Sequence, residues 1–337
     1  MKIYRSKKIL FISLLIIFFQ GCGKKVDLKE TTLIPDLSVG QLSDSTFIYD
    51  VYSIIPNKKL IYLDDYKNNR IIKLDDSLQG LITFGRSGKG PGEFTGAFYL
   101  QIWKDSIYCI DDGGMKMLVF DRDGNYAREF FIPRVMKQFA IDSLGNFYFS
   151  TPELTEPITV YDNIGNKIKG FGTLYYNGRT SRETRARNFR HLLISGNRLI
   201  AVGVSEPIIE IYNLNGKVIN KINLSDYPYI ENRISYAKEE IKKDQNNRDA
   251  TYILFDDVTV YNNELMCTIV DGNKKCNKIL VVKIDKDNLI PTEIITAKNK
   301  SGNTLGWITS ICATKQFLYL TTYNGFINRY YLNEVLN

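Results

Sequence analysis

The repeat that decides the fold is clearest in two stretches, KLIYLDDYKNNRIIKLDDSLQGLITFG at residues 59–85 and DSIYCIDDGGMKMLVFDRDGNYAREFF at residues 105–131. Each begins with a run of alternating apolar and polar residues that ends in Asp-Asp. A polar turn, a second run ending in Asp, another turn and a third run follow. Runs of β-branched and aromatic residues bounded by Asp, Asn and Gly turns predict short antiparallel strands.

Weaker copies of this pattern follow at residues 145–172, 196–224, 263–296 and 315–333. One more short apolar run precedes each copy, so a unit holds four strands and spans roughly 45 residues. Four-stranded units repeated around an axis are propeller blades, and stacking them buries both faces of each blade. The sequence therefore predicts an all-β, six-bladed β-propeller of four-stranded antiparallel blades over residues 41–337.

The ends of this repeat indicate how the ring closes. The sixth unit lacks its outermost strand, and residues 31–42 (TTLIPDLSVGQL) precede the first unit. An open array would expose strand edges, which soluble proteins avoid. We therefore predict that residues 22–40 form a tether and a strand that completes the sixth blade.

The first 21 residues are typical of a secretory signal. The basic start MKIYRSKK is followed by the apolar run ILFISLLIIFF, which is too short for a permanent membrane helix. Gly21 and Cys22 then resemble a bacterial lipoprotein cleavage box, with Phe19 where that box usually has Leu. The resemblance implies cleavage before Cys22 and lipidation of Cys22. An ordinary signal peptide with an incidental cysteine is the alternative.

The charge balance argues against nucleic acid as a partner. Four of the 44 basic residues lie within residues 1–21, so with 37 acidic residues the net charge falls from +7 to +3 after cleavage. A nearly neutral domain lacks the basic surface that binding to a phosphate backbone requires.

Four further cysteines would meet an oxidising compartment: Cys109, Cys267, Cys276 and Cys312. Asp271-Gly272 is a strong two-residue hairpin turn, and a tight hairpin there would place Cys267 opposite Cys276. A disulfide between Cys267 and Cys276 is one hypothesis. Two free, half-buried thiols are the other.

Two inserts interrupt the repeat, at residues 171–189 and 225–252. In the second, Ile230, Ile234, Ala237 and Ile241 share one side at helical spacing, which predicts a short helix near 230–245. This helix could cap a groove between blades or form a lid.

The first insert carries the densest positive charge, and we interpret its arginines as a solvated surface, with binding of acidic saccharides or lipid phosphates as the alternative. They are Arg179, Arg182, Arg185, Arg187 and Arg190.

The segment LDDYKNNRIIKLD resembles the NHL-repeat signature, in which Asp, Asn and Arg precede a hydrophobic strand ending in Asp. The segment GRSGKGPGEF at residues 85–94 is similar to one that recurs in six-bladed propeller lipoproteins of Bacteroidetes, a TolB-like, NHL-related group. The resemblance covers residues 40–333, although units three to six lack the Asp-Asp pair before the second turn. It implies a protein of the cell envelope, and Gly23 in place of Asp favours anchoring in the outer membrane.

GRSGKGPGEF is not a nucleotide-binding loop. Lys89 is followed by Gly90 and Pro91 rather than by Ser or Thr, and a strand follows where a phosphate loop needs a helix. The glycines suit a chain that crosses tightly from one blade to the next. Alternatively, the crossing contributes to a ligand-binding rim with the neighbouring turn residues, a set comprising Arg86, Lys89, Glu93, Asp65, Asn68 and Asp112.

The repeated acidic pairs have a structural interpretation of their own. Asp64 and Asp111 precede turns, where a carboxylate commonly binds backbone N–H groups. A Ca²⁺ site is the alternative, although no calcium-loop spacing is present. No other metal or cofactor is indicated.

Catalytic patterns are scarce in this sequence. His191 is the single histidine and falls in an expected inner strand beside Leu192 and Leu193, which favours a structural role. Zinc-binding spacings are missing. We therefore assign no catalytic residues.

Three functions remain open. The favoured one is a lipid-anchored, non-enzymatic module that binds an envelope protein or glycan at one propeller face. The second is a metal-assisted hydrolase or lyase with its site at the channel mouth. The third is a structural subunit of an envelope complex.

Overall fold

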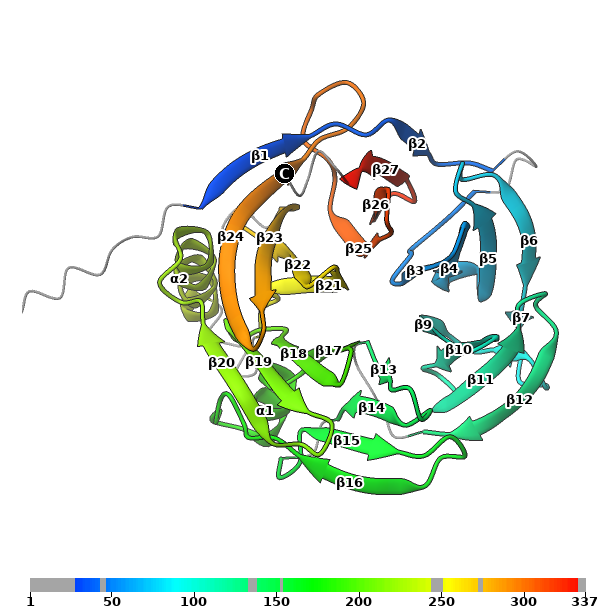
Figure 1. Ribbon diagram of the computed structural model, residues 1–337, viewed down its shortest axis with the longest axis horizontal. Coiled ribbons are helices and arrows are strands. Elements are labelled where there is room, and N and C mark those ends of the chain that lie inside the picture. Colours follow the sequence, from blue (N-terminus) through cyan, green and yellow to red (C-terminus); the bar gives the residue numbers. More distant parts are fainter. Residues whose placement is uncertain are drawn as a thin grey trace, which may run out of the picture.

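The computed structural model describes residues 28–42, 47–132, 138–151, 154–243, 251–271 and 275–332. The predicted signal peptide and Cys22 lie outside the described residues. Six antiparallel sheets surround one axis (Figure 1), as the sequence predicts. An all-β, six-bladed propeller is therefore confirmed.

The blades follow one another in chain order. Blade one is β3 (Ile54–Asn57), β4 (Leu60–Asp65), β5 (Arg70–Asp75) and β6 (Gly80–Phe84), and blade two is β9 (Ala97–Trp103), β10 (Ser106–Asp111), β11 (Lys116–Asp121) and β12 (Tyr126–Phe131). Blade three is β13 (Ala140–Ile141), β14 (Phe147–Ser150), β15 (Ile158–Tyr161) and β16 (Lys167–Phe171), and blade four is β17 (Arg190–Ser195), β18 (Arg198–Gly203), β19 (Ile208–Asn213) and β20 (Val218–Asn223). Blade five has β21 (Phe255–Tyr261), β22 (Glu264–Val270), β23 (Cys276–Asp285) and β24 (Asn288–Ala297), and blade six has β25 (Ile308–Ala313), β26 (Phe317–Thr322) and β27 (Ile327–Tyr331).

The first strand of each blade faces the axis (Figure 1). We call the side on which these inner strands begin the upper face and the side on which they end the lower face. The turn between the second and third strands of a blade and the crossing to the next blade therefore both lie on the upper face.

Aspartate and asparagine side chains form the recurrent turns. Asp121, at the end of β11, accepts hydrogen bonds from the backbone N–H groups of Asp123 and Asn125, both at 2.9 Å. Gly124 between them has a φ of 85°, a left-handed conformation that favours glycine. The same bonding pattern recurs after Asp75, Asp142, Asp162, Asn213 and Asn299.

The ring is closed by the N-terminal part of the chain. Strand β2 (Leu37–Val39) pairs antiparallel with β27 and supplies the fourth strand of blade six. The Asp36 carboxylate, just before β2, forms an ion pair with Arg329 of β27. The edge of the last blade is thereby covered.

A fifth strand on blade five was not expected from the sequence. Strand β1 (Lys29–Leu33) runs parallel to β24, with Lys29 opposite Glu293 and Leu33 opposite Ala297. The Leu33 side chain is buried in the core between blades five and six. Two successive N-terminal strands therefore hold neighbouring blades together (Figure 1).

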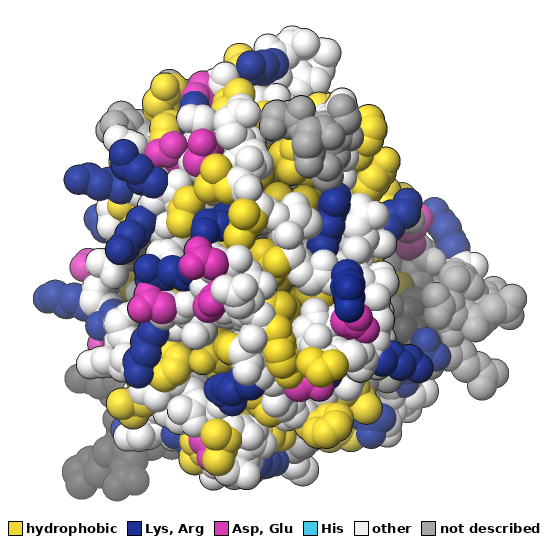
Figure 2. Space-filling model, turned by 90° about the vertical axis from the view of Figure 1, so that its right-hand side faces the viewer, with side chains coloured by type: hydrophobic (Ala, Val, Ile, Leu, Met, Phe, Trp, Pro, Cys, Tyr) yellow, Lys and Arg dark blue, Asp and Glu magenta, His cyan; other side chains and the backbone are white. Residues whose placement is uncertain are grey.

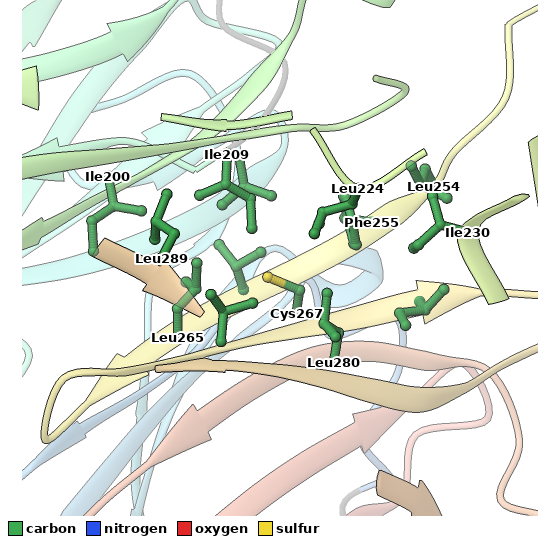
Figure 3. Close-up of a cluster of buried hydrophobic side chains, with 14 of the residues drawn as sticks. Ile200, Ile209, Leu224, Ile230, Leu254, Phe255, Leu265, Cys267, Leu280 and Leu289 are labelled. Carbon is green, nitrogen blue, oxygen red and sulfur yellow. The ribbon is translucent and has the colours of Figure 1, made fainter. Parts of the chain in front are cut away.

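The predicted helix is α2 (Pro228–Lys243), and it packs against the outside of blades four and five rather than forming a lid. Ile230 and Ala237 are buried, and Ile234 and Ile241 are partly buried against the same core. Figure 3 shows Ile230 beside Leu224 and Leu254, with the side chains of blade five beneath them.

The arginine-rich insert contains a second helix, α1 (Ser181–Arg187). Arg179, Arg182 and Arg185 are exposed, as the solvated interpretation predicts, whereas the last two arginines depart from it. Arg190 is fully buried, and its guanidinium lies over the Tyr175 ring, 3.8 Å from the centroid. Arg187 is mostly buried and forms an ion pair with Glu206. These two positive charges serve packing inside the protein.

The cysteine register differs from the predicted one. Cys267 lies opposite Leu280 in the β22–β23 ladder, whereas Cys276 lies opposite Val270. The Asp271 N–H donates to the Lys275 carbonyl at 2.7 Å, so the connection is longer than the two-residue turn that the disulfide required. Cys267 and Cys276 are instead free thiols, and they are fully rather than half buried.

Side-chain hydrogen bonds join neighbouring blades on the upper side. Ser310 Oγ accepts from the N–H of Ile54 at 3.2 Å, and Ser53 Oγ accepts from the N–H of Leu100 at 3.0 Å. Further bonds of this kind run from Arg190 N to Ser150 Oγ, from His191 Nε2 to the Phe255 carbonyl and from Ile311 N to Asp257 Oδ2. His191 is buried in this network, as a structural histidine would be.

The outer wall is mixed in character. Figure 2 shows it on the side of blades one and two, where Lys and Arg side chains surround a few Asp and Glu side chains, with hydrophobic side chains between them. Phe131 on β12 is 81% exposed, the most exposed of the large hydrophobic residues on this part of the wall. Among the described residues, no helix is both long enough and apolar enough to span a bilayer.

Candidate functional site

A cavity of about 250 Å³ lies on the axis of the ring, and all six blades contribute to its wall. Its lining runs from Ile54 and Val258 near the upper ends of inner strands to Ala313 at the lower end of β25. Gln138, which precedes β13, also lines it. Many of the lining side chains are apolar, but Gln101, Gln138 and Thr259 add polar groups along the wall.

Three inner strands carry a bulge near their upper ends. The bulge in β21 contains Asp256 and Asp257, the one in β25 contains Thr309, and the one in β9 contains Tyr99. A bulge breaks the alternation of a strand and redirects side chains, and bulges are common beside functional sites. Here the bulges hold two carboxylates and a tyrosine near the upper ends of the inner strands.

Asp257 is the most densely bonded of these groups. Its Oδ2 accepts from the Ser310 hydroxyl at 2.6 Å and from the Ile311 N–H at 2.8 Å, and its Oδ1 accepts from Gln138 Nε2. The last bond joins blade five to the segment that enters blade three. Burial raises the pKa of Asp257 to about 7 despite these bonds.

Tyr99 is held in a conformation that is unusual for its residue type. Its φ is 45°, and its N–H donates to Asp64 Oδ2 at 3.2 Å. Asp64 Oδ1 also accepts the N–H groups of Tyr52 and Ser53 at 2.8 Å each, and burial raises the pKa of Asp64 to about 8. Burial and the nearby Asp257 charge raise the pKa of the Tyr99 hydroxyl well above its usual range.

Aromatic rings continue the mouth toward solvent. Tyr52, Tyr66 and Phe98 are half-buried and meet edge to face, with centroids 5.0 to 5.7 Å apart. Tyr323, on the upper turn of blade six, is 67% exposed. Burial raises the pKa of Tyr52, and Tyr323 makes the smallest of the electrostatic contributions to that shift. Neighbouring blades thus present aromatic surface side by side.

Trp307 links these rings to the carboxylates. Its Nε1–H donates to Asp256 Oδ2 at 2.6 Å, and its carbonyl accepts from the Tyr323 N–H at 2.9 Å. We call the resulting set, whose members are all half-exposed or exposed, the mouth arc: Tyr52, Tyr66, Phe98, Asp256, Trp307 and Tyr323.

The glycine-rich crossing is a closed loop that satisfies its own charges. Strands β7 (Arg86–Ser87) and β8 (Glu93–Phe94) pair within it. Glu93 Oε1 accepts from Arg86 Nε at 2.8 Å, and Glu93 Oε2 accepts from the Gly90 N–H at 2.8 Å. The Gly90 N–H and Arg86 lower the pKa of Glu93. Phe94 is fully buried, as expected for the anchor of a crossing.

The other predicted rim residues lie in neighbouring loops. Asp65 is buried and bound to Arg70 at 2.7 Å, and Asn68 donates to the same carboxylate from the 3₁₀ turn Tyr66–Asn68. Lys89 and Asp112 are exposed. Sequence reasoning therefore placed these loops on one face, but four of the six side chains are engaged within the protein.

The acidic residues before the turns bind backbone N–H groups as predicted. Asp111 Oδ1 accepts from the N–H groups of Thr95 and Gly96, both at 2.8 Å. Asp64 does the same with three N–H groups. In the described part of the chain, no three His, Cys, Asp or Glu side chains are grouped so as to hold a metal ion.

The mouth arc was not identified from the sequence. Asp256 and Asp257 were visible as an Asp-Asp pair inside an otherwise apolar run, LFDDVTVY at 254–261. In a strand buried on both faces, two consecutive carboxylates put a charge on each face, and a bulge is one way to redirect them.

Solved structures with similar folds are distant in sequence. A protein from Bacteroides fragilis NCTC 9343, described as exported, is 14% identical, with 87% of this chain and 88% of that chain covered and a TM-score of 0.60. A virginiamycin B lyase from Staphylococcus aureus, crystallised with quinupristin, is 12% identical, with 84% and 80% covered and a TM-score of 0.52. A streptogramin B lyase is 15% identical, with 88% and 87% covered and a TM-score of 0.52.

At such identities these likenesses show the fold alone. A comparison with curated protein sequences finds no match. A family model described as 6-bladed beta-propeller (DUF5128) matches residues 41–317, which span the six inner strands and most of the blades around them. The chain belongs to this family of six-bladed β-propellers.

Proposed function

We propose that this protein is a lipid-anchored, non-enzymatic binding module of the cell envelope, which holds a protein or glycan ligand against the mouth arc. The observation that carries the proposal is the run of half-exposed and exposed rings that continues from Trp307 through Tyr323 to Tyr52. Large, rigid aromatic side chains supply contact area at a small entropic cost.

The polar groups at the mouth are better suited to binding a ligand than to catalysing a reaction. Asp64 and Asp257 are buried and already accept three hydrogen bonds each, so neither is free to act on a substrate. His191 is buried between blades four and five. The polar groups left at the surface can accept bonds from a ligand's hydroxyl or amide groups while the rings cover its apolar faces.

Binding to a glycan array and to a peptide library tests this proposal and separates the two ligand classes. Trp307→Ala and Tyr323→Ala should each weaken binding of any captured ligand at least about 30-fold, because one aromatic anchor carries about 2 kcal/mol or more. Phe131→Ala is the matched control, because Phe131 is exposed on the outer wall.

If Phe131→Ala weakened ligand binding as much as Trp307→Ala or Tyr323→Ala does, the mouth arc would not be the binding site. Turnover of an array ligand that depends on a divalent ion would favour the hydrolase or lyase alternative instead.

The membrane anchor is proposed from the resemblance of the N-terminus to a lipoprotein signal. Cys22→Ala should abolish incorporation of radiolabelled palmitate and release the protein from the membrane fraction. The outer membrane is the proposed location, in keeping with the similarity to propeller lipoproteins of Bacteroidetes with TolB-like and NHL-related repeats. Retention of the label in the variant would contradict the proposed anchor.

A further inference from the structure

A second cavity of about 250 Å³ lies on the lower face, between blades six and one. The loop from β3 to β4 contributes Lys58 and Lys59, and the loop from β25 to β26 contributes Lys315. Phe317 of β26 contributes aromatic surface, and the buried Tyr319 lies at the wall of the pocket. We call this cavity the lower-face pocket. It lies on the opposite side of the ring from the mouth arc.

The positive charge of this pocket is not neutralised by the protein. Lys58, Lys59 and Lys315 are exposed, and none of them forms an ion pair with another described residue. Asp76 is the one acidic side chain in the lining. Three ammonium groups around a concave surface create a positive field that favours an anion.

Beneath the lysines the pocket is apolar and holds an unsatisfied polar group. Tyr319 is 0% exposed, and within the described chain its hydroxyl oxygen makes no hydrogen bond. Buried hydroxyl groups are nearly always bonded, so one without a partner marks a place where a ligand or water completes the structure. The neighbouring Arg329 does not serve it, because that guanidinium is bound to Asp36 and lies over the Phe317 ring, 4.3 Å from the centroid.

We propose that the lower-face pocket binds a small amphiphilic anion, whose phosphate or carboxylate group meets the three lysines and whose apolar part lies on Phe317, next to the unsatisfied Tyr319 hydroxyl. Lysine ammonium groups form charge-assisted hydrogen bonds with phosphate and carboxylate oxygens. The aromatic side chains favour an anion with an apolar body over a bare inorganic ion. The site does not depend on the mouth arc, so either assignment can fail alone.

Calorimetric titration of the mature chain with hexyl phosphate, inorganic phosphate and hexanol tests the proposal. Hexyl phosphate should bind saturably to one site, and each of the other two probes should bind at least about tenfold more weakly because it lacks one half of the recognition. Lys58→Ala/Lys315→Ala should raise the Kd for hexyl phosphate about tenfold or more.

Tyr319→Phe is the sharpest variant, because it removes only a hydroxyl that bonds to no described group. The variant should keep the wild-type melting temperature and bind hexyl phosphate more weakly. Lys238→Ala/Lys243→Ala is the matched control, since both lysines are exposed on α2. This control should leave the Kd unchanged.

Vesicles distinguish the two sources of such an anion. The wild-type protein could bind phosphatidylcholine vesicles that contain phosphatidylglycerol, and Lys58→Ala/Lys315→Ala could abolish this binding. That result would identify the ligand as a lipid headgroup. Binding of hexyl phosphate alone would assign a soluble metabolite. The proposal would be overturned if none of the anionic probes bound saturably. It would also be overturned if Lys238→Ala/Lys243→Ala weakened hexyl phosphate binding as much as Lys58→Ala/Lys315→Ala does.

Discussion

Arg190 shows how a single buried charge depends on its partners. Its guanidinium and the Glu210 carboxylate are both buried, with Nη1 and Oε2 3.8 Å apart, and Tyr175 donates to the same carboxylate at 2.8 Å. Removing water from two charges is costly, so a buried pair is stable only while both members remain.

Glu210→Gln should therefore lower the free energy of unfolding by about 3–5 kcal/mol, because Arg190 would keep a buried charge without its counter-ion. Lys221→Ala is the matched control. Lys221 contacts the same carboxylate at 3.2 Å but is 44% exposed, and exposed pairs contribute about 1 kcal/mol or less. Urea denaturation measures the free energy of unfolding of both variants. If Glu210→Gln and Lys221→Ala lowered it equally, burial would not determine the energy of these ion pairs.

Asp257 gives the protein a pH dependence of defined sign. Its pKa is raised from 3.8 to about 7 in the folded protein, so the folded state retains a proton that the unfolded chain releases above about pH 4. That contribution to stability is complete below about pH 4 and is lost as the pH rises through about 7. Asp64, with a pKa raised to about 8, acts in the same direction.

The free energy of unfolding should fall between about pH 5 and about pH 7, by up to about 1.4 kcal/mol per pH unit for each of these two groups. Asp257→Asn should remove about half of this slope. Chemical denaturation at several pH values measures it. An unchanged slope in the variant would mean that Asp257 is ionised throughout this range in the folded protein.

Among the elements, helix α2 stabilises the ring by packing over the junction between blades four and five. Ile230 is 1% exposed and sits in the core shared by blades four and five. Ile230→Ala should lower the free energy of unfolding by about 2–5 kcal/mol, the usual cost of deleting buried methyl and methylene groups. Ser235→Ala, at an exposed position of the same helix, should change it by less than about 0.5 kcal/mol. Equal values in thermal or urea unfolding would mean that α2 is not part of the folded core.

Elements with a strong local sequence pattern could be predicted, and elements without one could not. The inner strands and the Asx turns have short-range signals, and the helical face of α2 repeats at three- and four-residue spacing. Helix α1 also had a signal that was overlooked: Thr180 and Glu183 form a capping box, in which Thr180 Oγ1 accepts from the Glu183 N–H at 3.0 Å. Strand β1 had no such signal, because its partner β24 is far away in the sequence.

The mouth arc could not be derived from the sequence for the same reason. Its residues come from blades one, two, five and six, and bulges decide which way several of them point. The rim prediction placed its loops on one shared face, because the turn chemistry of the repeat fixes which loops lie together. It could not show that Arg86 and Glu93 would bind each other.

For the whole molecule, closure of the ring is the property on which stability depends. Strands β1 and β2 cover the edges of β24 and β27, which would otherwise expose unpaired backbone groups. A mature chain lacking residues 28–40 should aggregate and lose its cooperative unfolding transition, whereas a chain lacking only residues 23–27 should unfold as the wild type does. Size-exclusion chromatography and calorimetry measure both. A monomeric, cooperative protein without residues 28–40 would show that the ring closes by other contacts.

The central claim is that the mouth arc is the binding face of the propeller, and photo-crosslinking in living cells tests it most directly. A photoreactive phenylalanine is placed at Tyr323 or Trp307 on the upper face, and at Phe131 on the outer wall as the control. We expect a discrete crosslinked species from the two mouth positions and none from Phe131. A species formed from Phe131 but not from Tyr323 or Trp307 would contradict it.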